Sequence, residues 1–484
     1  MIDVGKLRSG LREAVDSLDQ AKSSPDRTPA FTYVPPSHAR ALDLDATLVE
    51  GVRGAGKSFW WAQLASPTHR DFIRQVFPEV RLPQHLRIER GFGTGLPTAT
   101  APSADVLAEL VTTPYPPRSI WRAVVAFHAG IGGEFAQLGL WSERVQWVQT
   151  HAEEYDALLE AADLRLEAQD ETLLILFDAL DRLADDWKQI NPLAKALLQV
   201  ALHARSTRRI RCKVFVRPDI LQDSNITGFP DYAKLLAGKA SLEWRRADLY
   251  GLLFQCLANS DFGGLTFRNL VLTTVGLTLN QRANYWVLPA ALRIDERVQE
   301  ALFEQLAGTL MGGGTRRGKP YTWLVNHLQD GLNQVSPRSF FAALKTAVDE
   351  TGEDPALALN YRGIQLGVRK ASLIRVQEIT EDYPWVKWVM EPLRGELTVP
   401  CEAEEFEKLW DGNKTLATLK ASLKDGDTAV KLPPLNLSQG VSGVLVDLQL
   451  LGLVQRLING RIQMPDVYRL AFGLGRRGGQ KPMK

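Results

Sequence analysis

The sequence predicts an α/β protein that has a parallel-sheet core, then an all-helical region, then a small helix-and-hairpin module. Three observations indicate this division. Between Leu42 and Trp244, short apolar runs alternate with stretches of helical periodicity, as is typical of α/β domains. From Ala247 to Asp349 the strand signals cease and helical periodicity takes over. After Pro400, an apolar helix precedes an Asn-Gly pair that lies between two short segments of strand character.

Composition and charge exclude several classes of protein. The chain has 484 residues, with 57 Lys and Arg against 56 Asp and Glu, so its formal net charge is +1. It is therefore not a generally basic, DNA-coating protein, and any nucleic-acid contact must come from a local patch. The three cysteines lie far apart without metal-ligand spacing, which favours a reducing, cytoplasmic compartment over a disulfide scaffold. No apolar run approaches the roughly 18 residues of a membrane helix, so we expect no membrane partner.

The expected organisation has five parts. Residues 1–40 hold an amphipathic helix over 4–21 and a proline-rich linker over 23–38. Residues 41–245 form the α/β core, and its clearest buried strands are predicted at 47–50, 172–177 and 211–216. Residues 246–350 form a helical lid, 351–396 a helical connector, and 397–484 the final module with a basic tail.

The segment from Gly51 to Ser58, GVRGAGKS, matches the phosphate-binding loop pattern G-x-x-x-x-G-K-[ST]. An apolar strand precedes it and a helix-compatible stretch follows it, which is the order that the chemistry needs. Glycines let consecutive backbone N–H groups converge on phosphate oxygens, and the helix N-terminus adds partial positive charge there. We expect Lys57 to neutralise the β- and γ-phosphates and the Ser58 hydroxyl to ligate Mg²⁺; the alternative is a glycine turn beside an unrelated lysine. The residues expected to bind ATP are Gly51, Arg53, Gly54, Ala55, Gly56, Lys57 and Ser58.

An acidic residue ends the most apolar strand of the core. Residues 173–177 are five large apolar residues followed by Asp178, as in a central parallel strand buried on both faces. A carboxylate at this edge of an open α/β sheet lies where ligands bind. We expect Asp178 to anchor Mg²⁺ together with Ser58, and Asp181 to poise the attacking water or hold the metal. The alternatives are that Asp178 caps the next helix and that Asp181 is an ordinary acidic residue of a first helical turn.

The segment Phe177–Leu183, FDALDRL, resembles the second acidic motif of the STAND and KAP groups of P-loop ATPases. Most AAA+ ATPases carry a glutamate directly after the metal-binding aspartate, whereas this chain has Ala179 there. The resemblance therefore moves the catalytic acid to Asp181. An ATPase that lacks the usual glutamate could also be one that turns ATP over slowly.

Two further segments extend the resemblance. Residues 213–219, KVFVRPD, are similar to the strand that these families place beside the phosphate loop, with Arg217 where the γ-phosphate is sensed. Residues 336–340, SPRSF, resemble the lid motif of STAND and origin-recognition-type ATPases, in which an arginine, here Arg338, reaches back to the nucleotide. From the residues alone, Arg217 could instead cap a strand, and Arg338 could be a solvated arginine at a helix start.

The final module resembles a winged helix, an appendage that many of these ATPases carry after the lid. Its apolar helix is expected over 444–451, and Asn459-Gly460 predicts a hairpin because both residues accept φ > 0. Arg456 and Arg461 could contact nucleic-acid phosphates there. Such modules also serve for packing or for protein contacts, so a role without DNA stays open.

Together these patterns predict an ATPase that binds ATP and Mg²⁺ and acts as a molecular switch of AAA+/STAND type. The resemblance implies that nucleotide controls core–lid motion, and that ATP binding drives assembly of a homo-oligomer or signalling to a protein partner in trans. By family analogy, bacterial antiphage defence is the expected role. Two alternatives remain: a DNA-binding ATPase that loads or regulates factors at replication or mobile-element sites, and an adaptor that holds ATP without hydrolysing it.

Overall fold

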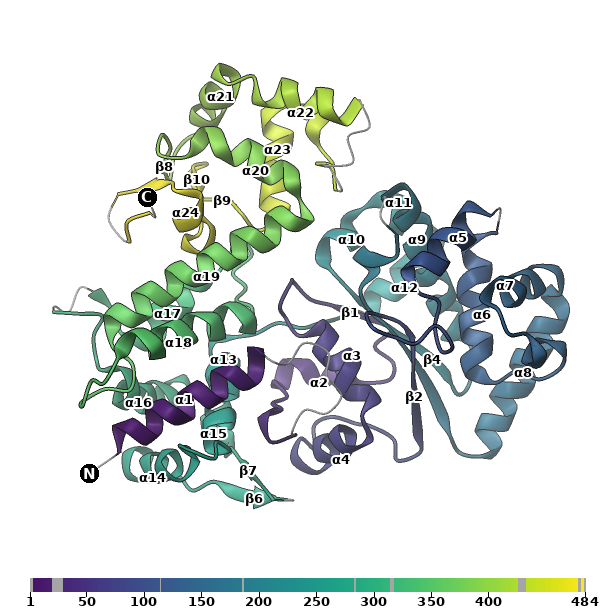
Figure 1. The fold of residues 1–484 in the computed structure, drawn as a ribbon, viewed down its shortest axis with the longest axis horizontal. Coiled ribbons are helices and arrows are strands. Elements are labelled where there is room, and N and C mark those ends of the chain that lie inside the picture. The colour runs from purple at the N-terminus through teal and green to yellow at the C-terminus, as the bar shows by residue number, and fades with distance from the viewer. Residues whose placement is uncertain are drawn as a thin grey trace. The chain divides into compact units, whose positions relative to one another are not determined.

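The computed structural model describes residues 3–19, 29–113, 115–184, 187–282, 284–313, 317–424, 432–477 and 480–482. The chain divides into two compact units (Figure 1). The sheet unit comprises Pro36–Glu243 together with Ala21–Pro29, and the helical unit comprises Met1–Gln20, Ala30–Pro35 and Trp244–Lys484. The observed division near residue 243 lies close to the predicted end of the core at 245, and the finer division into lid, connector and final module stays a prediction.

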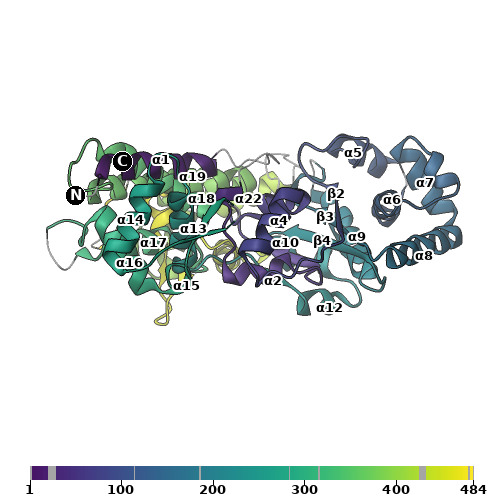
Figure 2. The same cartoon turned by 90° about the horizontal axis from the view of Figure 1, so that it is seen from below.

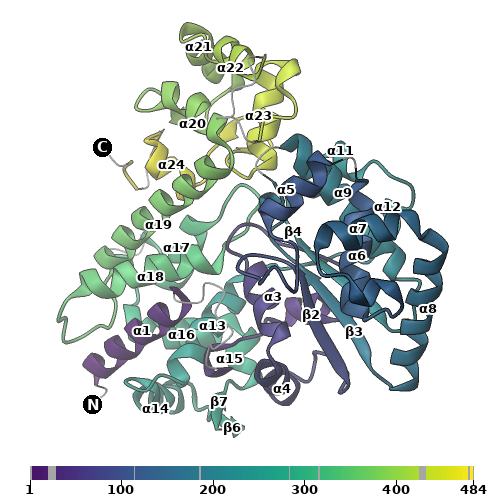
Figure 3. The same ribbon diagram turned by 45° about the vertical axis from the view of Figure 1, so that its right-hand side comes forward.

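The sheet unit contains a five-stranded parallel sheet with the strand order β2-β3-β4-β1-β5. Its strands are β1 (Leu48–Glu50), β2 (Leu86–Phe92), β3 (Thr172–Phe177), β4 (Ile210–Val216) and β5 (Ala240–Ser241). Its helices are α2 (Ala39–Leu42), α3 (Lys57–Ala65), α4 (Pro67–Val76), α5 (Ala104–Thr112), α6 (Pro117–Ala129), α7 (Trp141–Thr150), α8 (Ala152–Ala168), α9 (Trp187–Ala204), α10 (Pro218–Gln222), α11 (Ser224–Thr227) and α12 (Tyr232–Ala237). Helices α6, α8 and α9 lie on one face of the sheet, and α3 and α4 lie on the other (Figures 2 and 3).

Strand β3 carries the core of this unit because all six of its side chains are buried. On the α6 face, the Trp121 indole packs edge-on against the rings of Phe92 and Phe177, with centroids 6.0 and 5.8 Å apart. The three strands predicted from apolar runs are present. The two strands at the sheet edges were not predicted: β2 carries charged residues within its span, and β5 has two residues only.

The helical unit begins with the predicted N-terminal helix, α1 (Val4–Asp19), which packs on α13, α14 and α18. The other helices of this unit are α13 (Arg246–Ala258), α14 (Gly264–Val275), α15 (Ala290–Ile294), α16 (Glu296–Ala307), α17 (Pro320–Leu328), α18 (Pro337–Thr351), α19 (Tyr361–Asp382), α20 (Pro384–Met390), α21 (Ala403–Gly412), α22 (Thr415–Lys424), α23 (Val441–Leu450) and α24 (Asp466–Phe472). In the described ranges, no helix combines the length and the apolar character needed to cross a membrane.

The predicted proline-rich linker is wrong over residues 30–35, while residues 20–28 lie outside the described ranges. Tyr33 and Val34 are buried, with 2% and 0% of their surface exposed. The Tyr33 side chain fits against α13 at Gly251, where a Cβ would lie 2.6 Å from the Tyr33 hydroxyl oxygen. The prolines do exclude a long helix here, but the apolar residues between them pack into the helical unit.

A short hairpin interrupts the region that was predicted to be all-helical. Strands β6 (Asn280–Arg282) and β7 (Tyr285–Val287) pair antiparallel, and the side-chain amides of Gln255 in α13 and of Asn259, which follows that helix, hold β7 in place. Gln255 Nε2 donates to the Trp286 carbonyl at 2.7 Å, and the Asn259 amide both donates to that carbonyl and accepts from the Trp286 N–H, each at 2.8 Å. These contacts come from another part of the chain, so the local pattern of residues 280–287 does not reveal them.

The final module contains the expected helix, α23, and the expected antiparallel hairpin of β9 (Gln455–Arg456) and β10 (Ile462–Gln463). The turn differs from the prediction because Gly460 has φ 84° and Asn459 has no positive φ. Cys401 extends the hairpin by an antiparallel bridge to Ile462. A second small sheet joins β8 (Thr398–Val399) to β11 (Gly475–Arg476). Whether this module belongs to the winged helices stays a prediction.

Candidate nucleotide-binding site

The loop between β1 and α3 has the backbone that the phosphate-binding pattern requires. The Gly51 N–H donates to the Val216 carbonyl at 3.1 Å, so the loop starts as a continuation of the pairing with β4. Gly54 and Gly56 have φ of 80° and 104°, a region that residues with a Cβ rarely adopt. A Cβ on Gly56 would meet nothing within 4 Å, so there is space for a side chain. Glycine is favoured there because of the positive φ angle and not because of a close neighbour.

Helix α3 begins directly at the loop and presents a free positive end. Gly56 is its N-cap residue, and no described side chain caps the helix there. The N–H groups of a first helical turn have no partner within the helix, and together with the helix dipole they favour an anion. The loop and the start of α3 therefore form a site suited to phosphate.

Lys57 lies over this loop. Its Nζ donates to the carbonyl of Gly51 at 2.7 Å and to that of Val52 at 3.1 Å. Burial lowers the pKa of Lys57 to about 8, while the charge of Asp178 opposes that shift. Because the ammonium is partly desolvated and near a carboxylate, phosphate oxygens that take the place of the two carbonyls would favour its charged form.

Asp178 reaches Ser58 although the two residues are far apart in the sequence. Asp178 follows β3, its N–H donates to the Phe92 carbonyl at 3.1 Å, and only 4% of its surface is exposed. Burial raises the pKa of Asp178, and a hydrogen bond from the Ser58 hydroxyl and the charge of Lys57 work against that rise. The expected pair of magnesium ligands is thus brought into contact, and the N-cap residue of the turn after β3 is Ala179, not Asp178.

The donor set at this point fits a magnesium ion that is shared with a nucleotide. Mg²⁺ is usually held by one or two carboxylates, together with substrate phosphates and water. Ser58 and Asp178 supply a hydroxyl and a carboxylate from two adjacent elements. Over the described part of the chain, no cluster of three His, Cys, Asp or Glu side chains could hold a metal by itself.

The turn after β3 places Asp181 beside Arg217. Ala179 has φ 59° and ψ 44°, a left-handed conformation that is uncommon for alanine, and a short 3₁₀ turn, Leu180–Arg182, follows. The side chain of Asp181 is 31% exposed, and its Oδ2 lies 3.7 Å from Arg217 Nη1. Asp181 is therefore oriented towards the end of β4 and retains access to solvent.

Arg217 follows β4, and β4 pairs directly with β1 as the resemblance predicted. Arg217 is 7% exposed, and it is the N-cap residue of α10. Its Nε and Nη2 donate to the two carboxylate oxygens of Asp219 at 3.0 and 3.1 Å. Such a two-pronged pair fixes the plane of the guanidinium. Asp219 was not expected to be a site residue, although the spacing Arg-x-Asp at a strand end was visible in the sequence.

Arg338 lies in the helical unit and begins α18 as expected. The Ser336 hydroxyl caps this helix by accepting from the Ser339 N–H at 3.2 Å. The Arg338 guanidinium pairs with Glu378 of α19, and Glu378 also pairs with the buried Arg375. The Arg338 side chain is 49% exposed, so the alternative of a solvated arginine at a helix start stays open beside its pairing with Glu378. Its approach to the nucleotide stays a prediction.

The remaining predicted residues differ in their surroundings. Arg53 is half-buried in the phosphate loop. Arg456 is exposed on the hairpin, where Nη1 donates to the Gly460 carbonyl at 3.4 Å. Arg461 is held more firmly, since it donates to the Pro400 carbonyl and lies 3.7 Å from Glu402. Of the two candidate DNA-contacting arginines, Arg456 is the freer.

Two supporting contacts of the loop were missed by sequence reasoning. Glu50, directly before the loop, pairs with Lys239 at 2.5 Å and ties β1 to the chain before β5. His38 accepts from Trp60 Nε1 of α3 at 3.3 Å through Nδ1, and its Nε2 donates to the Glu243 carbonyl at 3.2 Å. Burial lowers the pKa of His38 to about 3, so the imidazole is neutral. A lone histidine and a lone glutamate have no sequence pattern that would mark such roles.

No protein-family model and no curated protein matches the sequence. Among solved structures, the chain is similar to Cdc6p from Pyrobaculum aerophilum, with 11% identity, 89% of this chain and 83% of that chain covered, and a TM-score of 0.30. It is also similar to the ORC2 protein of Aeropyrum pernix in its ADPNP-ADP complexes, with 15% identity, coverage of 90% and 93%, and a TM-score of 0.28. Because both TM-scores are this low, the inference of a nucleotide site rests on the residues described above.

Proposed function

We propose that the protein binds ATP with Mg²⁺ at the phosphate loop of the sheet unit and hydrolyses it as a nucleotide-dependent switch. The observation that carries this proposal is the contact of Ser58 with Asp178 beside Lys57. A glycine turn with an unrelated lysine would not need a hydroxyl, a carboxylate and an ammonium to meet at the ends of β1 and β3. A nucleotide bound with Mg²⁺ needs all three.

Each residue has a distinct task in this proposal. The N-terminus of α3 and the loop N–H groups bind the β-phosphate. The Lys57 ammonium exchanges its hydrogen bonds to the Gly51 and Val52 carbonyls for hydrogen bonds to phosphate oxygens. Ser58 and Asp178 would hold Mg²⁺, which would supply charge neutralisation on the nucleotide phosphates. In this proposal Arg217, oriented by Asp219, donates to the γ-phosphate, and Asp181 accepts a hydrogen bond from the attacking water.

The finer proposal is that the ATP-bound state assembles into a homo-oligomer and acts on a protein partner. It is supported by the resemblance of residues 336–340 to a lid motif and by the position of Arg338 at the start of α18. A role in bacterial antiphage defence follows from family analogy alone.

Specific observations favour each of the two alternatives. The exposed Arg456 and the fully exposed Ile458 at the hairpin tip favour a DNA-binding ATPase. Ala179, in place of a catalytic glutamate, and the pairing of Asp181 with Arg217 favour an adaptor that holds ATP without hydrolysing it.

The decisive experiment compares wild-type protein with Lys57→Ala by calorimetric titration with ATP and Mg²⁺. Lys57→Ala should abolish measurable ATP binding, because the phosphates lose the ammonium that lies over the loop. Lys234→Ala is the matched control, since Lys234 is an exposed lysine of the same unit that pairs with Asp231 at the surface. Wild-type affinity in Lys57→Ala would refute the site. Light scattering with ATP alone, and with ATP and duplex DNA, then separates the switch from the DNA-dependent loader.

A further inference from the structure

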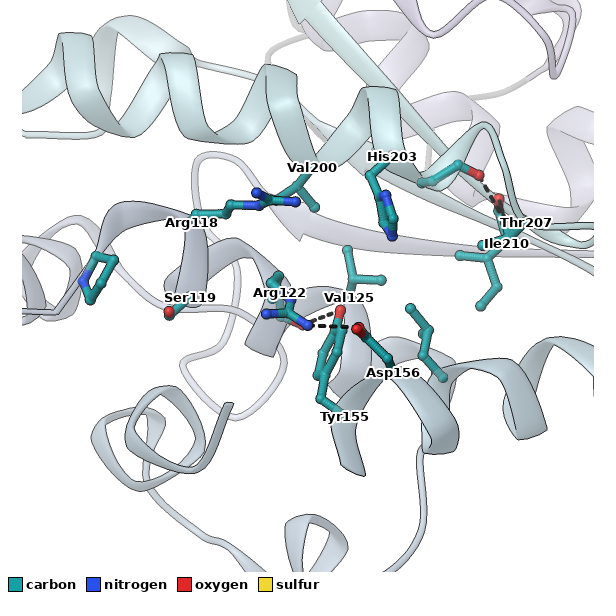
Figure 4. Close-up of a pocket in the computed structure, with 13 residues that line it drawn as sticks. Arg118, Ser119, Arg122, Val125, Tyr155, Asp156, Val200, His203, Thr207 and Ile210 are labelled. Carbon is teal, nitrogen blue, oxygen red and sulfur yellow. Dashed lines mark hydrogen bonds and ion pairs between the residues drawn. The ribbon is translucent and has the colours of Figure 1, made fainter. Parts of the chain in front are cut away.

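The sheet unit contains a cavity of about 270 Å³ between α6, α8 and α9 (Figure 4). Its lining includes an apolar set of side chains: Val125, Leu159, Val200 and Ile210. Ile210 begins β4, whereas Arg217 follows the other end of that strand. Seven strand residues span about 20 Å, so the cavity lies at the opposite edge of the sheet from the phosphate loop.

On one side of the cavity, the positive charge of Arg122 is compensated by the carboxylate of Asp156. Arg122 Nη2 lies 2.8 Å from Asp156 Oδ1, and the Arg122 guanidinium lies 3.9 Å from the centre of the Tyr155 ring. Figure 4 shows these three side chains grouped together on one side of the cavity. The paired Asp156 carboxylate does not attract a cation, and Arg122 contributes little net charge.

The other side has a cation without a partner. Arg118 is exposed, and its guanidinium makes no hydrogen bond or ion pair with another residue of the described ranges. In Figure 4 it extends along α9 towards Val200, and the ring of His203 lies farther along the same helix. No hydrogen bond or ion pair of the His203 imidazole with a described residue is present either. Arg118 and His203 thus supply two groups that can donate to an anion over an apolar surface.

The backbone adds to the positive potential at this side. Arg118 and Ser119 lie in the first turn of α6, a 13-residue helix with Pro116 as its N-cap residue and Pro117 as its first residue. These prolines have no N–H, and the Ser119 N–H donates to the Pro116 carbonyl at 2.8 Å, so this end contributes through the helix dipole. A long helix carries partial positive charge at such an end. The helix end, Arg118 and His203 therefore act together at the cavity, and no acidic side chain among its lining residues other than the paired Asp156 offsets them.

We propose that this cavity binds a small organic anion, with a ring or branched apolar body against Val125, Val200 and Ile210 and a carboxylate or phosphate group at Arg118 and His203. Pockets for drug-sized ligands have volumes of about 300–1,000 Å³, so a cavity of about 270 Å³ takes a compact ligand. The apolar part of the lining favours a ligand with an apolar body over a bare inorganic anion, and Arg118, unpaired within the described ranges, favours an anion over a neutral ligand. This site is separate from the proposed ATP site.

The test is a calorimetric titration of the full chain with four probes. Benzoate and phenyl phosphate combine an apolar ring with an anionic group. Benzyl alcohol has the ring without the anionic group, and inorganic phosphate has the anionic group without the ring; these two are the half-probes. The two phosphate probes are titrated into Lys57→Ala protein, so that the phosphate loop does not contribute. We expect benzoate or phenyl phosphate to bind at least about tenfold more tightly than either half-probe, which also tells a carboxylate site from a phosphate site.

Variants localise the binding. Arg118→Ala should weaken binding of the better anionic probe about tenfold or more, and Arg118→Lys should restore part of it. Val200→Phe should also weaken it by filling the cavity, and Arg118→Ala decides the matter if that variant does not fold. Lys188→Ala is the control, because Lys188 is exposed on α9 about 22 Å of helix away from His203. Binding that is undetectable for both anionic probes, matched by a half-probe, or unchanged in Arg118→Ala overturns the proposal.

Discussion

Arg217 Nη1 lies 3.7 Å from Asp181 Oδ2, where β4 and β3 end side by side. Arg217 Nε and Nη2 donate to Asp219 at 3.0 and 3.1 Å. Asp219 therefore holds the guanidinium through two hydrogen bonds, whereas Asp181 makes the longer ion pair. The Asp181 side chain is also 31% exposed, against 22% for Asp219. Asp181 can therefore turn from Arg217 to a water molecule while Asp219 keeps the guanidinium in place.

Asp181→Asn should leave ATP binding intact and lower turnover about 10²-fold or more, the usual scale for loss of a general base. Phosphate release and calorimetric ATP binding measure the two quantities separately. The bound ATP should then accumulate as the assembled oligomer in light scattering. Turnover at the wild-type rate would reduce Asp181 to a charge at a helix start, and a wild-type protein without any turnover would favour the adaptor.

Asp178→Asn should weaken ATP binding only when Mg²⁺ is present, and should lower turnover as well. The reason is that Asp178 contacts the Ser58 hydroxyl and supplies the charged oxygens for the metal. The measurement is the ratio of ATP affinities with Mg²⁺ and with a chelator. Asp231→Asn, at an exposed acidic residue of the same unit, should keep the wild-type ratio. An unchanged ratio in Asp178→Asn would remove Asp178 from the metal site.

Lys213→Met should destabilise the sheet unit by about 2–4 kcal/mol, because buried carbonyl groups that lose their hydrogen-bond donor cost about 1–3 kcal/mol each. Lys213 is fully buried, and its Nζ donates to the carbonyls of Ala41, Asp43 and Ala46 at 2.9, 2.7 and 2.7 Å. These carbonyls precede β1, so the loss should also loosen the approach to the phosphate loop. Urea unfolding measures the free energy, with the exposed Lys188→Met as control. A change below about 1 kcal/mol in Lys213→Met would contradict the role of Lys213 as the donor to these three carbonyls.

Acid should destabilise the sheet unit through His38. Burial lowers the folded-state pKa of His38 to about 3, below the value near 6.5 in the unfolded chain. The unfolded state thus binds the proton first, and stability is lost as pH falls through 6.5. By pH 4 this one group should remove about 3 kcal/mol of the free energy of unfolding.

The test measures the free energy of unfolding in urea at pH 7.5 and at pH 4.5 for wild type, His38→Gln and His128→Gln. The difference between the two pH values should be smaller in His38→Gln than in wild type. Burial also lowers the pKa of His128, to about 4, so its removal should reduce the pH dependence by less. A wild-type pH dependence that survives intact in His38→Gln would show that the neutral His38 between Trp60 and Glu243 is not its source.

DNA binding by the full chain should be weak or absent. If it is present, its dependence on salt should be steep, and the double variant Arg456→Ala, Arg461→Ala should flatten the slope by about two units. Arg456→Ala alone should flatten the slope by about one unit, and it is the more informative single variant because Arg461 is already held by Pro400 and Glu402. Submicromolar, salt-sensitive binding that Arg456→Ala weakens would favour the loader over the switch.

The sequence by itself determined the features that depend on neighbouring residues. The phosphate loop needs Gly54 and Gly56 for backbone angles that only glycine adopts readily, so the pattern and the conformation coincide. Strand β3 could be predicted because a parallel strand that is buried on both faces leaves an unbroken apolar run. The hairpin of β9 and β10 was visible in the same way, although its turn uses positive φ at Gly460 and not at Asn459.

Only the tertiary structure decided which distant residues meet. Ser58 and Asp178 come into contact because β4 lies between β1 and β3 and brings both strand ends to one edge of the sheet. Asp219 orients Arg217 through a pair of hydrogen bonds between their side chains. Residues 30–35 belong to the core because the Tyr33 side chain packs against α13 at Gly251. Such contacts arise when separate elements pack, and side-chain packing between segments far apart in the chain leaves no periodic signal in either segment.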